Sequence, residues 1–318
     1  MKQKILITLS VLFAVVILVS DCSKTKHKTE GKPTIVTTIF PPYDFAREIA
    51  GDNVNIIMLL PPGSESHSFE PAPKDIVEIQ NCNVFIYAGG ESDAWVEKIL
   101  SSMDTSKMKL IPLIKCVNAV EEKIVEGMQE EAEDNKDDKD KKPEYDEHVW
   151  TSPKNAKLIV QKISGTLCEI DSANANLYKK NTAAYRAKLD ELDIKFQNTV
   201  NKGVRKTIVF ADRFPFRYLA DAYKLRYFAA FPGCSTETEA SAATVKFLIN
   251  KIKAEKIPVV FHVEFSNQKM AKTISEATGA KVLLLHAAHN VSKDDLKSGQ
   301  TYLDIMTKNV SALKEALE

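Results

Sequence analysis

Four of the six histidines in the chain lie at the carboxyl ends of predicted strands or in the loops after them, where α/β proteins bind their ligands. His67 lies in the proline-bounded segment "PPGSESHSFEPAP", which follows the apolar run "VNIIMLL". His148 follows an acidic stretch, and His286 and His289 close "KVLLLHAAHN". The ligand crevice of a parallel sheet forms outside the carboxyl ends of its strands. Because imidazole binds divalent transition metals such as zinc, these residues predict a histidine-rich metal site.

Carboxylates near the same strand ends could complete such a site and would add affinity for harder ions such as manganese. The candidates in the sequence are Asp212, Glu239 and Glu264. Asp212 could instead pair with a nearby arginine, and Glu264 with a nearby lysine. A thiolate from Cys234 would also bind a soft metal, but a structural role for this cysteine is favoured.

Eight short apolar runs alternate with helical stretches. Continuous apolar runs of this kind indicate parallel strands that are covered on both faces. The sequence therefore predicts an α/β fold with two (β/α) lobes of mostly parallel strands, at 33–150 and 203–318. The expected strands are 34–40, 54–60, 83–89, 110–114, 207–211, 226–231, 258–264 and 281–286.

The region between the lobes, 151–202, is predicted to be helical. Apolar residues at Tyr185, Leu189, Leu192, Phe196 and Val200 recur at helical spacing. They indicate one face of a helix of about 30 residues, which would be about 45 Å long. We expect this helix to join the two lobes as a rigid spine.

The N-terminus predicts export from the cytoplasm. Residues 1–22 combine two lysines, an apolar run and a final Cys22, as in a signal peptide. "VSDC" resembles the lipobox of bacterial lipoproteins, which implies lipidation of Cys22, although Asp21 departs from the small residue expected there. Residues 23–32 are polar and predict a flexible tether.

Charge and cysteine content narrow the class of protein. The 43 basic residues equal the 43 acidic ones, so nothing favours nucleic acid as a partner. Separately, we expect the protein to be a monomer. The stretch 121–147 contains thirteen acidic and five basic residues and predicts a solvated surface loop.

Disulfides are permitted outside the cytoplasm. The pair to test first is Cys82–Cys116, and two free thiols are the equal alternative.

Longer motifs give a resemblance to a known family. "PPGSESHSFEPAPKD", "EHVWTSPKNA", "GGESDAWVEKIL", "TETEASAATVKFLINKIKAEKIPVVFHVE" and "GQTYLDIMTKNVSALKEAL" together resemble the metal-binding solute-binding proteins of ABC transporters that import zinc or manganese. The likeness spans nearly the whole chain after the leader. It implies one metal held between the lobes by four protein positions.

The resemblance assigns two of these positions directly and leaves two open. His67 and His148 match the first two ligands. The family's third ligand is a histidine in a pattern like "F-H-D-A-F-G-Y", whereas this chain reads "FADRFPF" with Ala211 in its place. The fourth family ligand is an Asp or a Glu at the positions of His286 and His289. A histidine gained in one loop could therefore replace the one lost in another.

The implied function is capture of a divalent metal, with zinc preferred over manganese, by a receptor anchored outside the cytoplasm that serves an ABC permease. Because imidazole binds metal only when unprotonated, capture should weaken below roughly pH 6. No bond is made or broken in this function, so the protein is not expected to be an enzyme. The alternatives are a manganese receptor of the same class, a surface adhesin and a zinc-dependent hydrolase.

Overall fold

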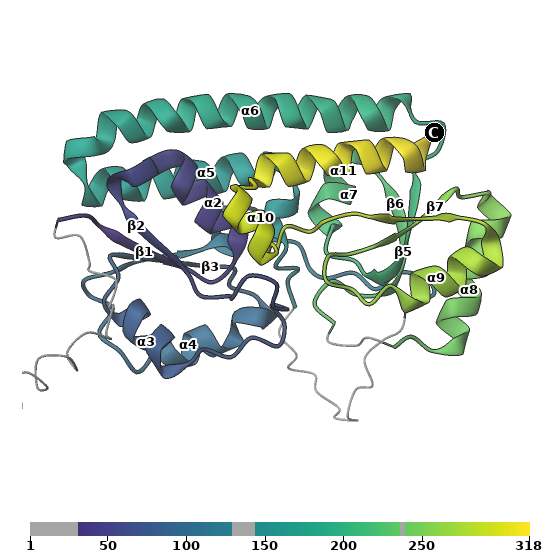
Figure 1. The fold of residues 1–318 in the computed structure, drawn as a ribbon, viewed down its shortest axis with the longest axis horizontal. Coiled ribbons are helices and arrows are strands. Elements are labelled where there is room, and N and C mark those ends of the chain that lie inside the picture. Colours follow the sequence, from purple (N-terminus) through teal and green to yellow (C-terminus); the bar gives the residue numbers. More distant parts are fainter. Residues whose placement is uncertain (1–30, 129–143, 236–238) are drawn as a thin grey trace, which may run out of the picture. The chain divides into compact units, whose positions relative to one another are not determined.

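Two four-stranded parallel sheets form the framework of the molecule (Figure 1). The computed structural model describes residues 31–128, 144–235 and 239–318. The strand orders are β2-β1-β3-β4 and β6-β5-β7-β8, and every pairing is parallel. The strands are β1 (Thr34–Thr37), β2 (Asn55–Met58), β3 (Val84–Tyr87), β4 (Lys109–Pro112), β5 (Thr207–Arg213), β6 (Arg226–Phe231), β7 (Val259–His262) and β8 (Lys281–Leu284). The predicted two-lobed α/β fold is confirmed.

Helices cover both faces of the first sheet, which forms the N-terminal lobe with them. Val36 and Phe85 pack on one face against Ile79 and Val96 of the helices α3 and α4. Ile35 points to the opposite face and packs against the helices α2 and α5. Burial on both faces explains why the strands are apolar throughout rather than alternating. These helices are α2 (Phe40–Ala50), α3 (Pro73–Gln80), α4 (Ala94–Leu100) and α5 (Pro153–Ile170).

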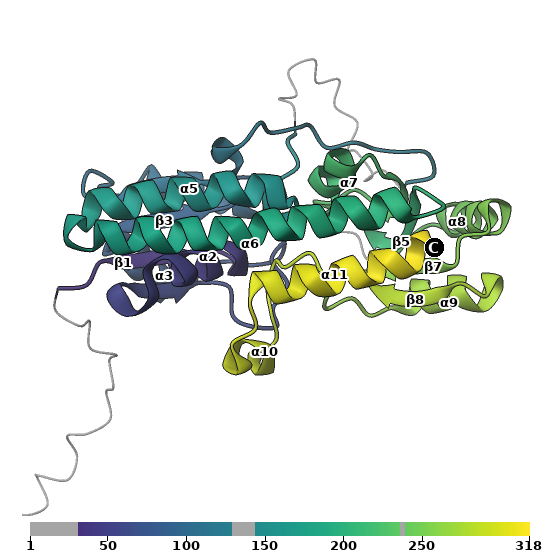
Figure 2. The ribbon, with the colours of Figure 1, turned by 90° about the horizontal axis from the view of Figure 1, so that it is seen from above.

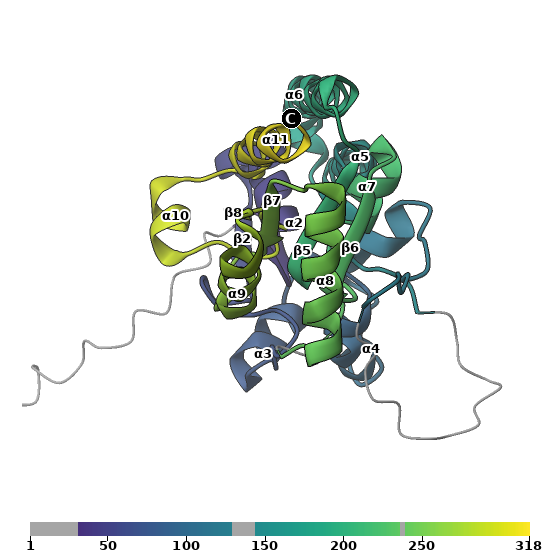
Figure 3. The ribbon, with the colours of Figure 1, turned by 90° about the vertical axis from the view of Figure 1, so that its right-hand side faces the viewer.

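The second sheet, with its own helices, forms the C-terminal lobe (Figure 3). Val209 of β5 packs against Leu248 of α8 and Ile274 of α9. Its neighbour Ile208 belongs to the cluster on the other face, together with Leu313 of α11. The helices of this half of the chain are α7 (Arg217–Tyr223), α8 (Ala242–Glu255), α9 (Lys269–Thr278), α10 (Lys293–Ser298) and α11 (Tyr302–Leu317).

A single long helix, α6 (Ala175–Lys202), runs beside both lobes (Figures 1 and 2). Its 28 residues span about 42 Å at 1.5 Å per residue. It contacts α2 and α5 in the first lobe and α7 and α11 near the second. The predicted stripe from Tyr185 to Val200 is buried along it. The connection between the lobes is therefore a packed helix.

Cys82 and Cys116 are not joined by a disulfide, which was one of the two equal alternatives for this pair. Cys82 lies just before β3 and Cys116 just after β4. Since β3 and β4 are parallel neighbours, these two positions lie at opposite ends of the sheet, and a disulfide needs Cα atoms within about 7 Å.

The expected signal peptide, its Cys22 and most of the tether lie outside the described residues. Within the described part of the chain, no helix combines the length and apolarity that a membrane crossing requires.

Candidate metal centre

Three histidines and one glutamate converge between the lobes. His67 lies in the loop after β2, Glu147 and His148 directly precede the short helix that leads to α5, and His289 lies in the loop after β8. Each residue offers one ligand atom, and these four atoms all lie within 4.8 Å of one another. The loops at the carboxyl ends of β2 and β8 therefore meet where the topology of parallel sheets predicts a ligand crevice.

One nitrogen of each imidazole in this cluster, Nε2, lacks a partner among the described residues. The Nε2 atoms of His67, His148 and His289 are buried without a hydrogen bond. Ring centroids are separated by 5.9 Å for His67 and His148, 5.3 Å for His67 and His289, and 4.7 Å for His148 and His289. Because buried polar atoms are almost always satisfied, three such nitrogens facing one point indicate a site that binds a cation.

Glu147 supplies the negative charge at this point. Its side chain is fully buried, and its Oε1 lies 3.9 Å from Nε2 of both His67 and His289. Burial pushes the pKa of Glu147 upward, but the neighbouring imidazoles of His289, His148 and His67 outweigh it and hold that pKa well below its usual range. The centre therefore contains an ionised carboxylate among histidines, which a divalent cation would neutralise.

Two of the histidines are oriented by carboxylates of their own loops. Nδ1 of His67 lies 2.9 Å from Oε1 of Glu65, and Nδ1 of His148 lies 3.0 Å from Oδ1 of Asp146. With the proton on Nδ1, each ring directs the lone pair of Nε2 to the cluster. Burial lowers the pKa of His148, but Asp146 outweighs it, so the net pKa shift is upward.

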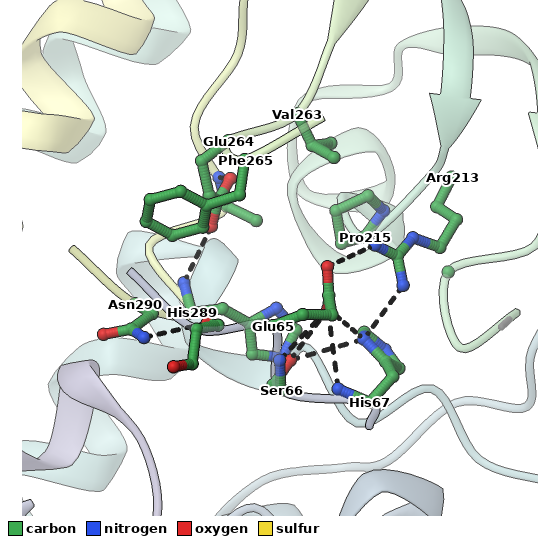
Figure 4. A pocket seen from close by; sticks show the side chains of 13 residues that line it. Glu65, Ser66, His67, Arg213, Pro215, Val263, Glu264, Phe265, His289 and Asn290 are labelled. Carbon is green, nitrogen blue, oxygen red and sulfur yellow. Dashed lines mark hydrogen bonds and ion pairs between the residues drawn. The ribbon is translucent and has the colours of Figure 1, made fainter. Parts of the chain in front are cut away.

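A further ion pair supports Glu65 from the other lobe (Figure 4). Nη2 of Arg213, at the end of β5, donates to Oε2 of Glu65 at 2.7 Å. Nη1 of the same side chain lies 3.1 Å from Nδ1 of His67. Burial raises the pKa of Glu65, but the contacts with His67 and Arg213 outweigh it and keep that pKa well below its usual range.

The loop that carries His289 is tied to both lobes. Backbone N–H groups of Ala287 and His289 donate to Glu264 at 2.7 and 3.1 Å. Nε1 of Trp150 donates to the carbonyl of Ala287 at 2.8 Å, and Nδ2 of Asn290 donates to two carbonyls of the loop before His67. Burial lowers the pKa of His289 to about 4, so its imidazole is neutral at pH 7.

His286 is not in the cluster, although the sequence predicted it as a ligand. Its Nδ1 accepts a hydrogen bond from the backbone N–H of Ala288 at 3.0 Å, within a turn where Ala288 has a φ of 61°. Its own backbone N–H and carbonyl are bound by the side chain of Asn309. His286 therefore shapes the turn that presents His289.

The three candidate carboxylates also lie outside the group of four. Asp212 accepts from the backbone N–H groups of Arg213 and Val263, which occupies both of its oxygens. Glu239 is exposed, and Glu264 holds the backbone of the His289 loop.

Cys234 is buried at the C-lobe side and is likewise absent from the cluster. Burial raises the pKa of its thiol well above the usual range. Such a thiol resists deprotonation, which supports the structural role that the sequence favoured.

Ala211 leaves space where the family resemblance predicts a histidine. It lines a cavity of about 170 Å³ together with Asp212, Phe231 and Met270. The paired side chains of Glu65 and Arg213 line both this cavity and the pocket that contains His67 and His289. The side chain that reaches the cluster from β5 is therefore that of Arg213, which contacts Glu65 and Nδ1 of His67 and is not a metal ligand.

Glu147 is a member of the cluster that the sequence did not predict as a ligand. It ends the stretch 121–147, which was expected to be a solvated loop, and this expectation does not hold for Asp146 and Glu147, because both are buried. Residues 129–143 of the stretch lie outside the described residues. Glu121 forms an antiparallel bridge with Tyr145, and the hydroxyl of Tyr218 donates to the carbonyl of Asp146 at 2.7 Å. The available signal was position, since Glu147 directly precedes a histidine already predicted to bind metal.

The chain is similar to known proteins along nearly its whole length. Residues 35–316 match the family described as zinc-uptake complex component A, periplasmic. The chain is 32% identical over 299 residues to the zinc-binding lipoprotein AdcA of Streptococcus pneumoniae R6, covering 93% of this chain and 58% of that protein. It is also 32% identical over 315 residues to the high-affinity zinc uptake system protein ZnuA of Bacillus subtilis 168, covering 97% of both.

One solved structure bears directly on the fold. The crystal structure of the Zn(II)-bound ZnuA-like domain of S. pneumoniae AdcA aligns with a TM-score of 0.74 at 31% identity. The alignment covers 90% of this chain and 99% of that domain. The chain thus spans a little over half of the full AdcA protein and nearly all of this domain.

Proposed function

Because the chain belongs to the family of periplasmic zinc-uptake complex component A proteins, we propose that it captures Zn²⁺ outside the cytoplasm and delivers it to an ABC permease. The family is a family of transport binding proteins, and the chain is not an enzyme. The observation that carries the proposal is the convergence of three unpartnered, buried imidazole nitrogens on one buried, ionised carboxylate.

The proposed ligands are His67, Glu147, His148 and His289. Three nitrogens and one oxygen within 4.8 Å suit the tetrahedral coordination that zinc prefers. Manganese sites usually contain more oxygen, and affinity for a nitrogen-containing site rises from manganese towards copper and zinc. The donor set therefore favours zinc over manganese.

Capture is an exchange of ligands. The hydrated ion gives up water as the imidazoles of His67 and His148, oriented by Glu65 and Asp146, present Nε2. Glu147 contributes charge, so that the four ligands, with neutral imidazoles, together carry −1 before binding and +1 with a bound dication. Since His289 comes from the opposite lobe, the bound ion would link the two lobes, and their separation would release it.

Metal titration of the purified chain tests the proposal. Zinc should compete with a chromophoric chelator and raise the melting temperature, because a ligand that binds only the native state stabilises it. Manganese should bind more weakly by about 100-fold or more. Equal affinity for manganese would contradict the zinc assignment, and no binding of either ion would contradict the function.

We also propose that the chain is anchored by a lipid at Cys22. The signal-like residues 1–22 support this, and relatives carry the name lipoprotein. Mass spectrometry of the mature protein should find diacylglycerol on Cys22, and Cys22→Ala should move the protein to the soluble fraction. An unmodified cysteine in the membrane fraction would contradict lipidation.

A further inference from the structure

We infer that Gly90 and Ser92 form a cradle that positions Glu147 as the carboxylate ligand of this centre. The inference rests on the proposed function. It identifies how this chain supplies a fourth ligand although Ala211 occupies the place of the family's third histidine. The cradle belongs to the N-terminal lobe, in the segment between β3 and α4.

Ser92 binds both oxygens of the Glu147 carboxylate. Its backbone N–H donates to Oε2 at 3.0 Å, and its hydroxyl donates to Oε1 in a short hydrogen bond. Oε1 is also the oxygen nearest Nε2 of His67 and His289. A carboxylate held at both oxygens cannot rotate away from the three imidazoles, so its orientation is set before a metal arrives.

Gly90 provides the space that Glu147 needs. A Cβ built at Gly90 would overlap both Cβ and Oε2 of Glu147. The backbone of Gly90 has a φ of −106°, which any residue can adopt. Glycine is therefore required here by the close approach of Glu147 and not by backbone conformation.

The cradle is itself held rigidly. Oδ2 of Asp93 accepts hydrogen bonds from the backbone N–H groups of Ala88 and Gly89 at 2.6 and 3.3 Å, and from the hydroxyl of Thr38 at 3.2 Å. Asp93 is buried. These contacts fix the turn that presents Ser92 to the carboxylate.

The alternative is that Ser92 only stabilises the fold through a buried hydrogen bond. The two roles differ in what they change. A positioning residue alters the geometry and affinity of the bound metal in a protein that is still folded, whereas a structural residue alters stability alone.

The test compares Ser92→Ala, Ser92→Thr and Gly90→Ala with the wild type, using Zn²⁺ for affinity and Co²⁺ absorption as a report on coordination geometry. Ser102→Ala is the matched control, because that exposed hydroxyl donates only to the carbonyl of Ile99 at 2.8 Å. Gly165→Ala is the control for the glycine, since a Cβ there would meet nothing within 4 Å. Melting temperatures of the metal-free proteins report on folding.

We expect Ser92→Ala to weaken zinc binding by about 10–100-fold, the usual loss for a group that orients a ligand, and to change the Co²⁺ spectrum. Ser92→Thr should restore both because it keeps the hydroxyl. Gly90→Ala should change the spectrum in the same direction, and both controls should match the wild type. Wild-type affinity and spectrum in folded Ser92→Ala and Gly90→Ala would overturn the inference. Absence of zinc binding by the wild type would instead refute the proposed function itself, and the inference with it.

Discussion

The two lobes have the same sheet topology but contribute unequally to the metal centre. Both sheets place the first strand of each half beside the second and third, in the orders β2-β1-β3-β4 and β6-β5-β7-β8. Among the residues that the structure describes, the N-terminal lobe contributes His67, Glu147 and His148 to the group of four, and the C-terminal lobe contributes His289. Topology thus determines which loops meet at the crevice, while side-chain identity in those loops determines how the ligands are shared.

The lobes also differ in how their donors are held. In the N-terminal lobe, side chains of Glu65, Asp146 and Ser92 each contact a neighbouring cluster residue. In the C-terminal lobe, Glu264 instead holds the backbone around His289. The position of His289 therefore depends on the shape of one loop, and mutations in that loop test the contribution of the C-terminal lobe most directly.

The largest expected effect is the removal of His289, the C-lobe member of the group of four. His289→Ala should weaken zinc binding by more than about 100-fold, because losing a mere supporting partner of a ligand already costs about 10–100-fold. His286→Ala should cost less than about tenfold, since its contact with the N–H of Ala288 only shapes the turn. Competition with a chelator at fixed pH measures both. A larger loss for His286→Ala than for His289→Ala would reverse the assignment of the C-lobe ligand.

The framework could be predicted because its signals are local. Apolar runs such as Val259–His262 are buried on both faces, and the apolar stripe of α6 has helical spacing. The open choice at Cys82 and Cys116 also follows from the fold. Cys82 precedes one strand and Cys116 follows the next, and parallel pairing of these strands places the two cysteines at opposite ends of the sheet.

The site could be predicted only where a residue type is chemically distinctive. His67, His148 and His289 stood out as imidazoles at strand ends or beside them. Glu147 did not stand out, because it is one of thirteen acidic residues in the stretch 121–147 and its sequence context does not indicate burial. The choice between His286 and His289 depends on the left-handed turn at Ala288, which no residue pattern in "HAAHN" specifies.

Acidification should protonate the histidines of the two lobes at different pH values. The pKa of His148 is raised from the usual 6.5, and that of His289 is lowered to about 4. As the pH falls, His148 therefore takes a proton first, and zinc affinity should drop about tenfold per pH unit below its pKa, because one proton competes with the ion. Titrations between pH 5 and pH 8 measure this slope. A pH-independent affinity across this range would contradict the role of His148 as a ligand.

Asp146, whose carboxylate contacts the ring of His148, should set the pH at which the loss of zinc affinity begins. In Asp146→Asn the amide oxygen can still accept from Nδ1–H, but the charge that raises the pKa of His148 is gone. The loss of zinc affinity should therefore begin at a lower pH in the variant. The ratio of zinc affinity at pH 5 to that at pH 7.5 should be several-fold higher for the variant than for the wild type. Glu169→Gln, an exposed change, is the control. An unchanged onset would mean that Asp146 orients the ring without tuning its protonation.

The smallest effect concerns the second contribution of the C-terminal lobe, the pair between Arg213 and Glu65. Glu65 is 39% exposed in its side chain, so this pair should contribute at most about 1 kcal/mol, which is about fivefold in affinity. Arg213→Met should therefore weaken zinc binding by up to about fivefold, through loss of the support that Glu65 gives to His67. In a Glu65→Gln background this support is already reduced, and removing the guanidinium, which repels a dication, should leave the affinity equal or slightly higher. Chelator competition on all four proteins of this cycle measures the coupling. An equal loss in both backgrounds would show that Arg213 acts independently of Glu65, through its own contact with Nδ1 of His67.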